Sequence, residues 1–147
     1  MKRAPSRTET TPAVNQSYGN RHRATEVRAK RAEKLIEIDF DDGRSFRLPA
    51  ELLRVESPSA EVQGHDPQRK TIVAGKRHVG IVAVEPVGTY AIRIRFDDGH
   101  DTGLYTWDWL YSLGEDQQRI WRTYLDALAD RGLSRDPVSP HPRADGS

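Results

Sequence analysis

The sequence predicts an α+β fold: two similar β-hairpin units form small antiparallel sheets, with a short helix after each unit and a helix at the C-terminal end. The main observation is a repeat, in which Ile36-Glu37-Ile38-Asp39-Phe40-Asp41-Asp42-Gly43 returns 56 positions later as Ile92-Arg93-Ile94-Arg95-Phe96-Asp97-Asp98-Gly99. In each copy apolar and polar residues alternate, the pattern of a strand with one buried face. The Asp-Asp-Gly that follows is typical of a tight turn, because aspartate bonds its own backbone and glycine reaches positive φ without steric cost.

Local signals place the remaining elements. Apolar alternation predicts strands over residues 34–40, 45–48, 79–85, 89–96 and 103–105. Short helices follow at 49–54 and 107–113, since Pro49 suits a first helical turn and Thr106 can cap the second helix. Gly114 is expected to end that helix, and a last helix is expected over 115–131. Its predicted apolar stripe comprises Trp121, Leu125 and Leu128, with Tyr124 beside them.

Charge divides the chain into a basic start and an acidic body. Residues 1–34 hold nine Lys or Arg and three Asp or Glu, a net +6, whereas the remaining 113 residues carry −5. Because residues 1–32 lack periodic apolar positions, we expect a disordered basic tail that is dispensable for folding. The predicted folded domain covers 33–131, and the proline-containing segment 132–147 is expected to be flexible.

Composition excludes several classes of protein. The chain has no cysteine, which excludes disulfides, thiolate metal sites and a cysteine nucleophile. No apolar run approaches the length of a membrane span, and the basic N-terminus lacks the apolar core of a secretory signal. A cytoplasmic protein without membrane association is therefore expected.

Four segments carry a family resemblance: Leu53-Arg54-Val55-Glu56-Ser57-Pro58-Ser59-Ala60-Glu61-Val62-Gln63-Gly64-His65, Val79-Gly80-Ile81, Glu85-Pro86-Val87-Gly88-Thr89-Tyr90-Ala91 and Phe96-Asp97-Asp98-Gly99-His100-Asp101-Thr102-Gly103-Leu104-Tyr105. They resemble the gamma-butyrobetaine hydroxylase-like N-terminal domain, also catalogued as domain of unknown function 971, over about Lys34–Gly114. In that family the domain occurs alone as a small bacterial protein, in front of carnitine-pathway oxygenases, and on Mrp-type iron–sulfur carrier ATPases. The resemblance implies an association with metalloenzymes or iron–sulfur carriers.

The resemblance also bears on metal binding. Oxygenase members of the family carry a zinc site of the form Cys-Pro-Cys-x-x-Cys with a later histidine. The matching positions here are Ser57, Ser59, Val62 and His100. Since hydroxyls are poor zinc ligands and valine is none, we expect a protein without metal or other cofactor. The chain also lacks the oxygenase domain, so hydroxylase activity is not expected.

Two catalytic or metal-binding alternatives use histidine. His65 and His100 lie in two Gly-His-Asp triplets, and with Asp101 they could hold iron or zinc if the two loops met. The interpretation we favour is that the aspartates form turns and that His100 packs against the hairpin. A hydrolase set of Ser57, Ser59 or Glu61 with either histidine is not favoured, because no nucleophile elbow accompanies it.

Four aromatic residues occur within seven positions, at Tyr105, Trp107, Trp109 and Tyr111. They could all fill the core, but aromatic residues are also enriched in binding hot spots. We therefore predict a partner-binding site formed by these four residues, with His100 at its edge. At least one of the rings should then keep a substantial part of its surface in solvent.

The sequence favours a non-catalytic accessory domain that binds a protein partner. The first alternative is a metal-binding protein or metal-dependent enzyme that uses His65, His100 and nearby aspartates. The second is a nucleic-acid or anionic-surface binder that acts through the basic tail. Nucleic acid is not the expected partner, since no aromatic residue beyond Tyr18 interleaves with the basic residues. The oligomeric state is left open.

Overall fold

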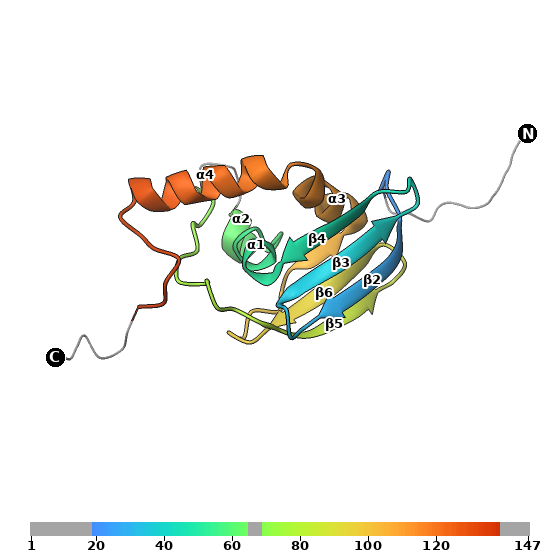
Figure 1. The fold of residues 1–147 in the computed structure, drawn as a ribbon, viewed down its shortest axis with the longest axis horizontal. Helices are drawn as coiled ribbons and strands as arrows, with labels where there is room; N and C mark the ends of the chain where they lie inside the picture. Colours follow the sequence, from blue (N-terminus) through green and yellow to red (C-terminus); the bar gives the residue numbers. More distant parts are fainter. Residues whose placement is uncertain (1–18, 65–68, 139–147) are drawn as a thin grey trace, which may run out of the picture.

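The computed structural model describes residues 19–64 and 69–138. Two three-stranded antiparallel sheets and several helices make up these residues, which confirms the predicted α+β class (Figure 1). The first sheet has the order β2-β3-β4, with β2 at Ala24–Lys30, β3 at Leu35–Phe40 and β4 at Ser45–Pro49. The second has the order β5-β6-β7, with β5 at Ile81–Val87, β6 at Ala91–Phe96 and β7 at Leu104–Thr106.

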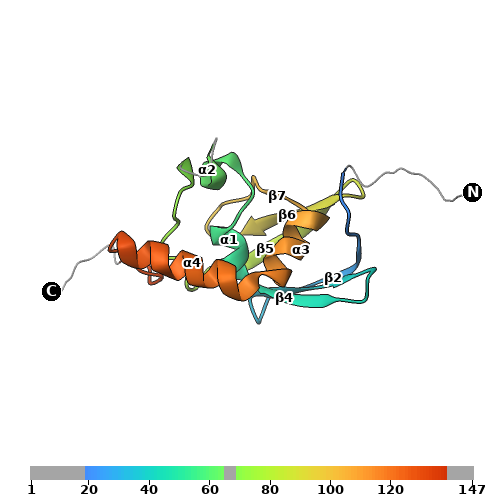
Figure 2. The ribbon, with the colours of Figure 1, turned by 90° about the horizontal axis from the view of Figure 1, so that it is seen from above.

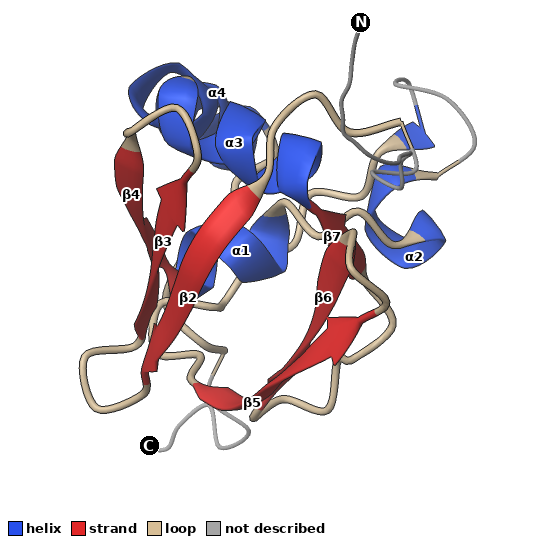
Figure 3. Ribbon diagram, turned by 90° about the vertical axis from the view of Figure 1, so that its right-hand side faces the viewer, coloured by secondary structure: helices blue, strands red, loops and turns tan. Residues whose placement is uncertain are grey.

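The helices cover the opening between the sheets. Their bounds are α1 Ala50–Val55, α2 Ala60–Gln63, α3 Trp107–Glu115 and α4 Gln117–Asp130. Figure 3 shows that the sheets splay apart, with α1 between them and with α3 and α4 across one end. In Figure 2, α4 lies alongside α1, where Tyr124 and Leu128 pack against Val55. The main core lies between the inner faces of the sheets and includes the fully buried Ile38 and Ile94.

The two Asp-Asp-Gly turns are nearly identical. Gly43 has a φ of +90° and Gly99 a φ of +91°. In both turns the backbone N–H after the glycine donates to the second aspartate, at 2.9 Å to Asp42 and 3.0 Å to Asp98. The repeated Asp-Asp-Gly sequence thus forms the same turn in both units.

The substitution Gly99→Val is expected to destabilise the fold by about 1–3 kcal/mol, since a β-branched residue is strained at this φ. A Cβ at Gly99 would meet no atom within 4 Å, so the loss would come from backbone strain alone. Urea denaturation of the variant would measure it. Asp101→Val, at an exposed position in the following loop, serves as the control, and equal stability of both variants would contradict the role of φ.

The prediction that residues 1–32 are disordered is wrong for Ala24–Lys30, which form strand β2. This strand pairs antiparallel with β3, and Val27 packs against the core. Both units are thus three strands followed by a helix, and both outer strands carry a bulge after the residue that pairs with the phenylalanine, Ala24 with Phe40 and Ile81 with Phe96. Hydrogen bonding to a neighbour, rather than apolar periodicity, makes this segment a strand.

The chain before β2 is tied to the second unit. The Arg21 and His22 backbone N–H groups donate to the Asp108 carboxylate in the first turn of α3, each at 2.9 Å. The His22 ring stacks on Tyr111 with 3.5 Å between the ring centroids. We call residues 20–22 the N-terminal clasp.

The segment that follows α4 also packs on the domain, so the prediction of a flexible tail from residue 132 is wrong as far as residue 138. Gly132 has a φ of +65° and ends the helix as predicted. The Gly75 N–H then donates to the Ser134 carbonyl at 2.9 Å. Two bonds of 2.7 and 2.8 Å join the Arg135 guanidinium to the carboxylate of Glu51 in α1.

Gly114 does not end α3, which continues to Glu115. The glycine is required by packing, because a Cβ at this position would lie 2.2 Å from Cγ of Phe46 in β4. The predicted stripe of α4 also needs correction. Tyr124 and Leu128 are buried, whereas Leu125 is exposed, since it lies one position beyond the buried row.

Candidate functional site

A polar cluster, buried except for Glu61, joins the two units at His100. The turn between β6 and β7 brings this histidine to the loop between α1 and α2. Its Nε2 lies 2.9 Å from the Ser57 hydroxyl and 3.5 Å from the Ser59 hydroxyl, and its Nδ1 lies 3.3 Å from the Glu61 carboxylate. We call these four residues the His100 cluster.

The surroundings favour a neutral imidazole. Burial lowers the pKa of His100 below its usual range, and the nearby Arg54 guanidinium adds to this effect. The geometry suits the tautomer in which Nε2 accepts from the Ser57 hydroxyl, which leaves the proton on Nδ1, 3.3 Å from the Glu61 carboxylate. Ser57 Oγ in turn accepts from the Ser59 backbone N–H at 3.3 Å.

Asp98 fixes the turn that carries His100. Its carboxylate contacts Arg54 of α1 at 2.7 Å and Lys76 at 2.6 Å. Burial alone would raise the pKa of Asp98, but the hydrogen bonds from Lys76, the His100 N–H and Arg54 outweigh it and hold the pKa at about 2. The turn is therefore held by charge-assisted bonds to two separate segments.

The residues of the cluster do not fit zinc. The structure brings together Ser57, Ser59 and His100, three of the four positions that the family resemblance assigned to a metal, and Val62 at the fourth is also buried. The two hydroxyls face the imidazole nitrogen that a metal would need, and neither is a thiolate or carboxylate. Across 19–64 and 69–138, no three His, Cys, Asp or Glu side chains are grouped so that they could hold a metal. Asp101 is exposed, and His65 lies outside the described residues.

In space, Glu61, His100 and Ser57 follow one another as the acid, histidine and serine of a hydrolase triad do. The Ser57 hydroxyl, however, is inaccessible to solvent. The Ser57 residue is 0% exposed. A Cβ built on Gly103 would lie 2.5 Å from Ser57 Oγ, so the chain before β7 passes directly over the hydroxyl. A carbonyl substrate cannot reach the nucleophile position in this arrangement. The cluster instead joins the α1–α2 loop to the β6–β7 turn.

The cluster predicts an acid-dependent loss of stability. Because the folded-state pKa of His100 lies below the unfolded value of about 6.5, the unfolded chain binds its proton more readily. The contribution of His100 is therefore complete above about pH 6.5 and is lost as the pH falls through the folded-state pKa. Urea denaturation at a series of pH values should show a smaller loss of stability between about pH 7 and pH 5 in His100→Gln than in the native chain.

His78→Gln is the matched control for this experiment, since His78 is exposed. Its stability should follow the native pH dependence. An unchanged pH dependence in His100→Gln would contradict the neutral buried imidazole.

The predicted partner-binding residues divide into buried and half-buried ones. Tyr105 is completely buried, with its hydroxyl donating to the Leu53 carbonyl at 2.6 Å. Tyr111 is also buried, with its hydroxyl 2.6 Å from Asp42, and so is His100. Trp107 and Trp109 are half-buried and use their indole N–H groups on the Thr89 and Glu56 carbonyls. A partner could therefore contact only the two tryptophans of the predicted set.

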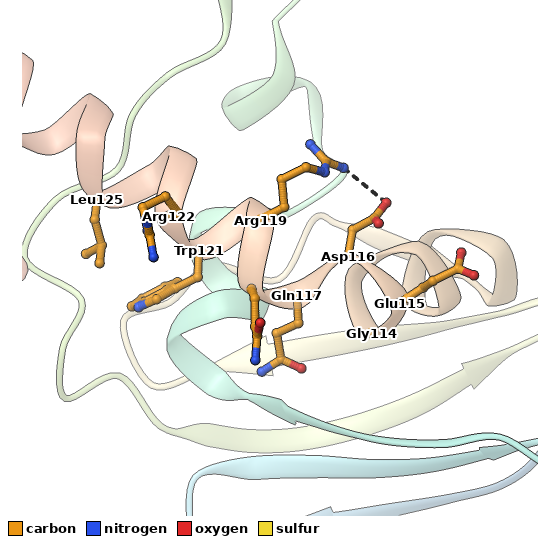
Figure 4. A pocket seen from close by; sticks show the side chains of 9 residues that line it. Gly114, Glu115, Asp116, Gln117, Arg119, Trp121, Arg122 and Leu125 are labelled. Atoms are coloured by element: carbon orange, nitrogen blue, oxygen red, sulfur yellow. Dashed lines mark hydrogen bonds and ion pairs between the residues drawn. The ribbon is translucent and has the colours of Figure 1, made fainter.

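A groove that the sequence did not indicate runs along the start of α4 (Figure 4). It is open, has a volume of about 1090 Å³, and is lined by Gly114, Glu115, Asp116, Gln117, Gln118, Arg119, Trp121, Arg122 and Leu125. Trp121 is half-buried, and Leu125 is 36% exposed. The sequence did not indicate the groove because Leu125 fits an apolar stripe with Trp121, whereas the i, i+4 pair Tyr124 and Leu128 defines the stripe that is buried.

Several basic residues between residues 19 and 34 form ion pairs or hydrogen bonds within the fold. Arg28 forms ion pairs with Glu37 and Asp39, and Lys30 lies 3.9 Å from Glu37. Arg31 donates to the Val82 carbonyl at 3.0 Å. These bonds reduce the charge available for nucleic acid.

The protein is a small α+β domain with two sheets, built from two β-β-β-α units. The model of the family described as gamma-butyrobetaine hydroxylase-like, N-terminal, matches residues 27–111. The chain belongs to this family.

Solved structures with similar folds and sequences include two determined by NMR and one by crystallography. Two solution NMR structures are 44% and 43% identical in sequence, with TM-scores of 0.69 and 0.68; they align to 84% and 90% of this chain and to 98% and 96% of their own. A crystal structure from Acidithiobacillus ferrooxidans, a protein of unknown function in the DUF971 family, is 41% identical with a TM-score of 0.53 and aligns to 63% of this chain and 92% of its own. A search among curated proteins gives no match. Within the described residues, no helix is long and apolar enough to cross a membrane.

Proposed function

We propose that this chain is a non-catalytic accessory domain that binds a protein partner through the α4 groove. The observation that carries the proposal is the groove itself, in which Trp121 and Leu125 offer apolar surface beside the charged Arg119 and Arg122. Exposed aromatic and arginine side chains are typical anchors of protein interfaces. The serine–histidine–acid arrangement at His100 is sealed, which favours binding over catalysis.

The partner class follows from the family. Its domains occur fused to oxygenases and to iron–sulfur carrier ATPases, so we propose a metalloenzyme or an iron–sulfur carrier as the partner, which would supply the chemistry. Trp107 and Trp109 remain the candidates for a second contact on α3, since part of each residue reaches the surface.

Leu125→Asp is expected to weaken binding at least about tenfold while leaving the melting temperature nearly unchanged, because Leu125 is exposed and hot-spot anchors of interfaces carry about 2 kcal/mol or more. Isothermal titration against an Mrp-type iron–sulfur carrier ATPase from the same organism measures the change. Thr123→Asp adds the same charge at an exposed position of α4 outside the groove and should bind normally.

Two results would count against the proposal. Failure of the native chain to bind the carrier would reject an iron–sulfur carrier ATPase as the partner. Equal affinity of the native chain and Leu125→Asp would reject the groove as the binding site.

A further inference from the structure

The outer faces of the two sheets carry opposite charge at equivalent positions. The repeat aligns Glu37 and Asp39 of β3 with Arg93 and Arg95 of β6. All four alternate with buried isoleucine and phenylalanine residues, so their side chains lie on the outer faces. The two sheets can therefore be compared for how the charged residues of each central strand are paired.

On the outer face of the first sheet, the carboxylates of the central strand are neutralised by ion pairs. Arg28 of β2 contacts Glu37 at 3.1 Å and Asp39 at 3.0 Å. From the other side, Arg47 of β4 contacts Glu37 at 3.2 Å, and the Ser45 hydroxyl donates to Asp39 at 2.7 Å. Each carboxylate of the central strand thus has partners on both neighbouring strands.

On the outer face of the second sheet, the arginines of the central strand are exposed and weakly paired; we call this the open face. β5 places Glu85 opposite Arg93 and Ala83 opposite Arg95, and β7 places Leu104 opposite Arg93 and supplies no partner for Arg95. Arg95 and Glu85 form a long ion pair of 3.9 Å, and their side chains are 51% and 46% exposed. Within residues 19–64 and 69–138, Arg93 has no ion pair and is exposed.

We propose that this open face, formed by Arg93 and Arg95 with Glu85 and the half-buried Ala83 and Leu104 beside them, binds an acidic polypeptide segment in extended conformation, whose carboxylates would replace the long contact of Arg95 with Glu85. The two arginines are two residues apart on one strand, which separates them by about 7 Å. Alternate carboxylates of an extended peptide have the same spacing. Guanidinium groups bind carboxylates in bidentate fashion, and a rigid central strand holds both in position.

An acidic polypeptide suits the face better than nucleic acid does. The chain carries a net charge of only +1, which gives little long-range attraction for a long polyanion, whereas a short acidic segment needs only the local field. Nucleic-acid binding gains its affinity from many phosphate contacts, and this face offers two arginines. The apolar side chains beside them can contact the intervening residues of a peptide.

The test uses the full chain and a fluorescent peptide of alternating glutamate and serine, with binding followed by fluorescence anisotropy at low and physiological salt. The native chain should bind, with an affinity that falls as salt increases. The double variant Arg93→Glu, Arg95→Glu should bind at least about tenfold more weakly. Arg23→Glu, Arg131→Glu makes the same change in net charge on exposed residues outside this face and outside the α4 groove, and it should bind within about twofold of the native chain.

Two additional measurements, with the Leu125→Asp variant and with an oligonucleotide, distinguish this face from the α4 groove and from a nucleic-acid site. The Leu125→Asp variant should bind the peptide normally, so the groove and this face fail or succeed independently. Arg93→Gln, Arg95→Gln replaces the charge-reversed variant if that variant melts at a lower temperature, and it should also bind more weakly than the native chain. No binding by the native chain at low salt, an equal loss in the Arg23→Glu, Arg131→Glu control, or tighter binding of a thymidine oligonucleotide of equal length would each overturn the proposal.

Discussion

A chain that begins at Glu33 is expected to lose most of its stability. This truncation removes β2, so β3 becomes an edge strand and loses six residue pairings with it. Arg28 is removed as well, which leaves the outward carboxylates of Glu37 and Asp39 without their nearest guanidinium. A domain of this size is stable by only about 5–15 kcal/mol, so the loss of an entire strand is expected to consume most of that margin.

The same truncation removes the N-terminal clasp. Asp108 would lose the two backbone N–H groups of Arg21 and His22, and Tyr111 would lose its stacked partner. Stacked aromatic pairs contribute about 0.5–1.5 kcal/mol beyond the burial of their surface. The truncation therefore weakens both units, although it removes a strand from only one.

A chain that begins at Gly19 is the matched control, because it retains both the clasp and β2. Its melting temperature should be close to that of the full chain, whereas the chain from Glu33 should melt far lower or fail to show a cooperative transition by circular dichroism. Equal melting temperatures for the two truncated chains would show that β2 and the clasp add little.

The elements that could be predicted from the sequence are those specified by residues close to them in the chain. The β3–β4 and β6–β7 hairpins followed from alternation and from Asp-Asp-Gly, because those signals lie within a few residues of the structure that they specify. Strand β2 could not be predicted in this way. Its sequence Ala24-Thr25-Glu26-Val27-Arg28-Ala29-Lys30 has one large apolar residue, and its conformation depends on β3 and on carboxylates at more distant positions, Glu37 and Asp39.

The His100 cluster was predicted only in part, for the same reason. The family resemblance related Ser57, Ser59 and His100, but nothing in their spacing indicated that the two loops meet. They meet because Arg54 in α1 holds Asp98 in the β6–β7 turn, a contact across 44 positions. The α4 groove required still more distant information, since the exposure of Leu125 depends on how α4 is rotated against α1.

Gly114→Ala is expected to destabilise the fold by about 1–3 kcal/mol, although helix propensity alone predicts a gain of about 1 kcal/mol. The new Cβ would lie 2.2–2.6 Å from three carbons of the Phe46 ring. That ring cannot move freely, because the ring centroids of Tyr111 and Phe40 lie 5.4 Å and 5.9 Å from its own, and the Arg44 guanidinium lies over it at 5.1 Å. Packing therefore opposes propensity at this position, and the larger effect decides the sign.

Urea denaturation of four chains measures the packing contribution: native, Gly114→Ala, Phe46→Ala and the double variant. Phe46→Ala removes Cγ, Cδ1 and Cδ2, the three ring atoms that the new methyl group would contact, so the Gly114→Ala substitution should cost much less in that background, giving a coupling energy of about 1 kcal/mol or more. Ser112→Ala, at an exposed position of the same helix, is the control for propensity and should be neutral or slightly stabilising. If Gly114→Ala stabilised the native chain as Ser112→Ala does, α3 would have room at Phe46, and the glycine would not be a packing requirement.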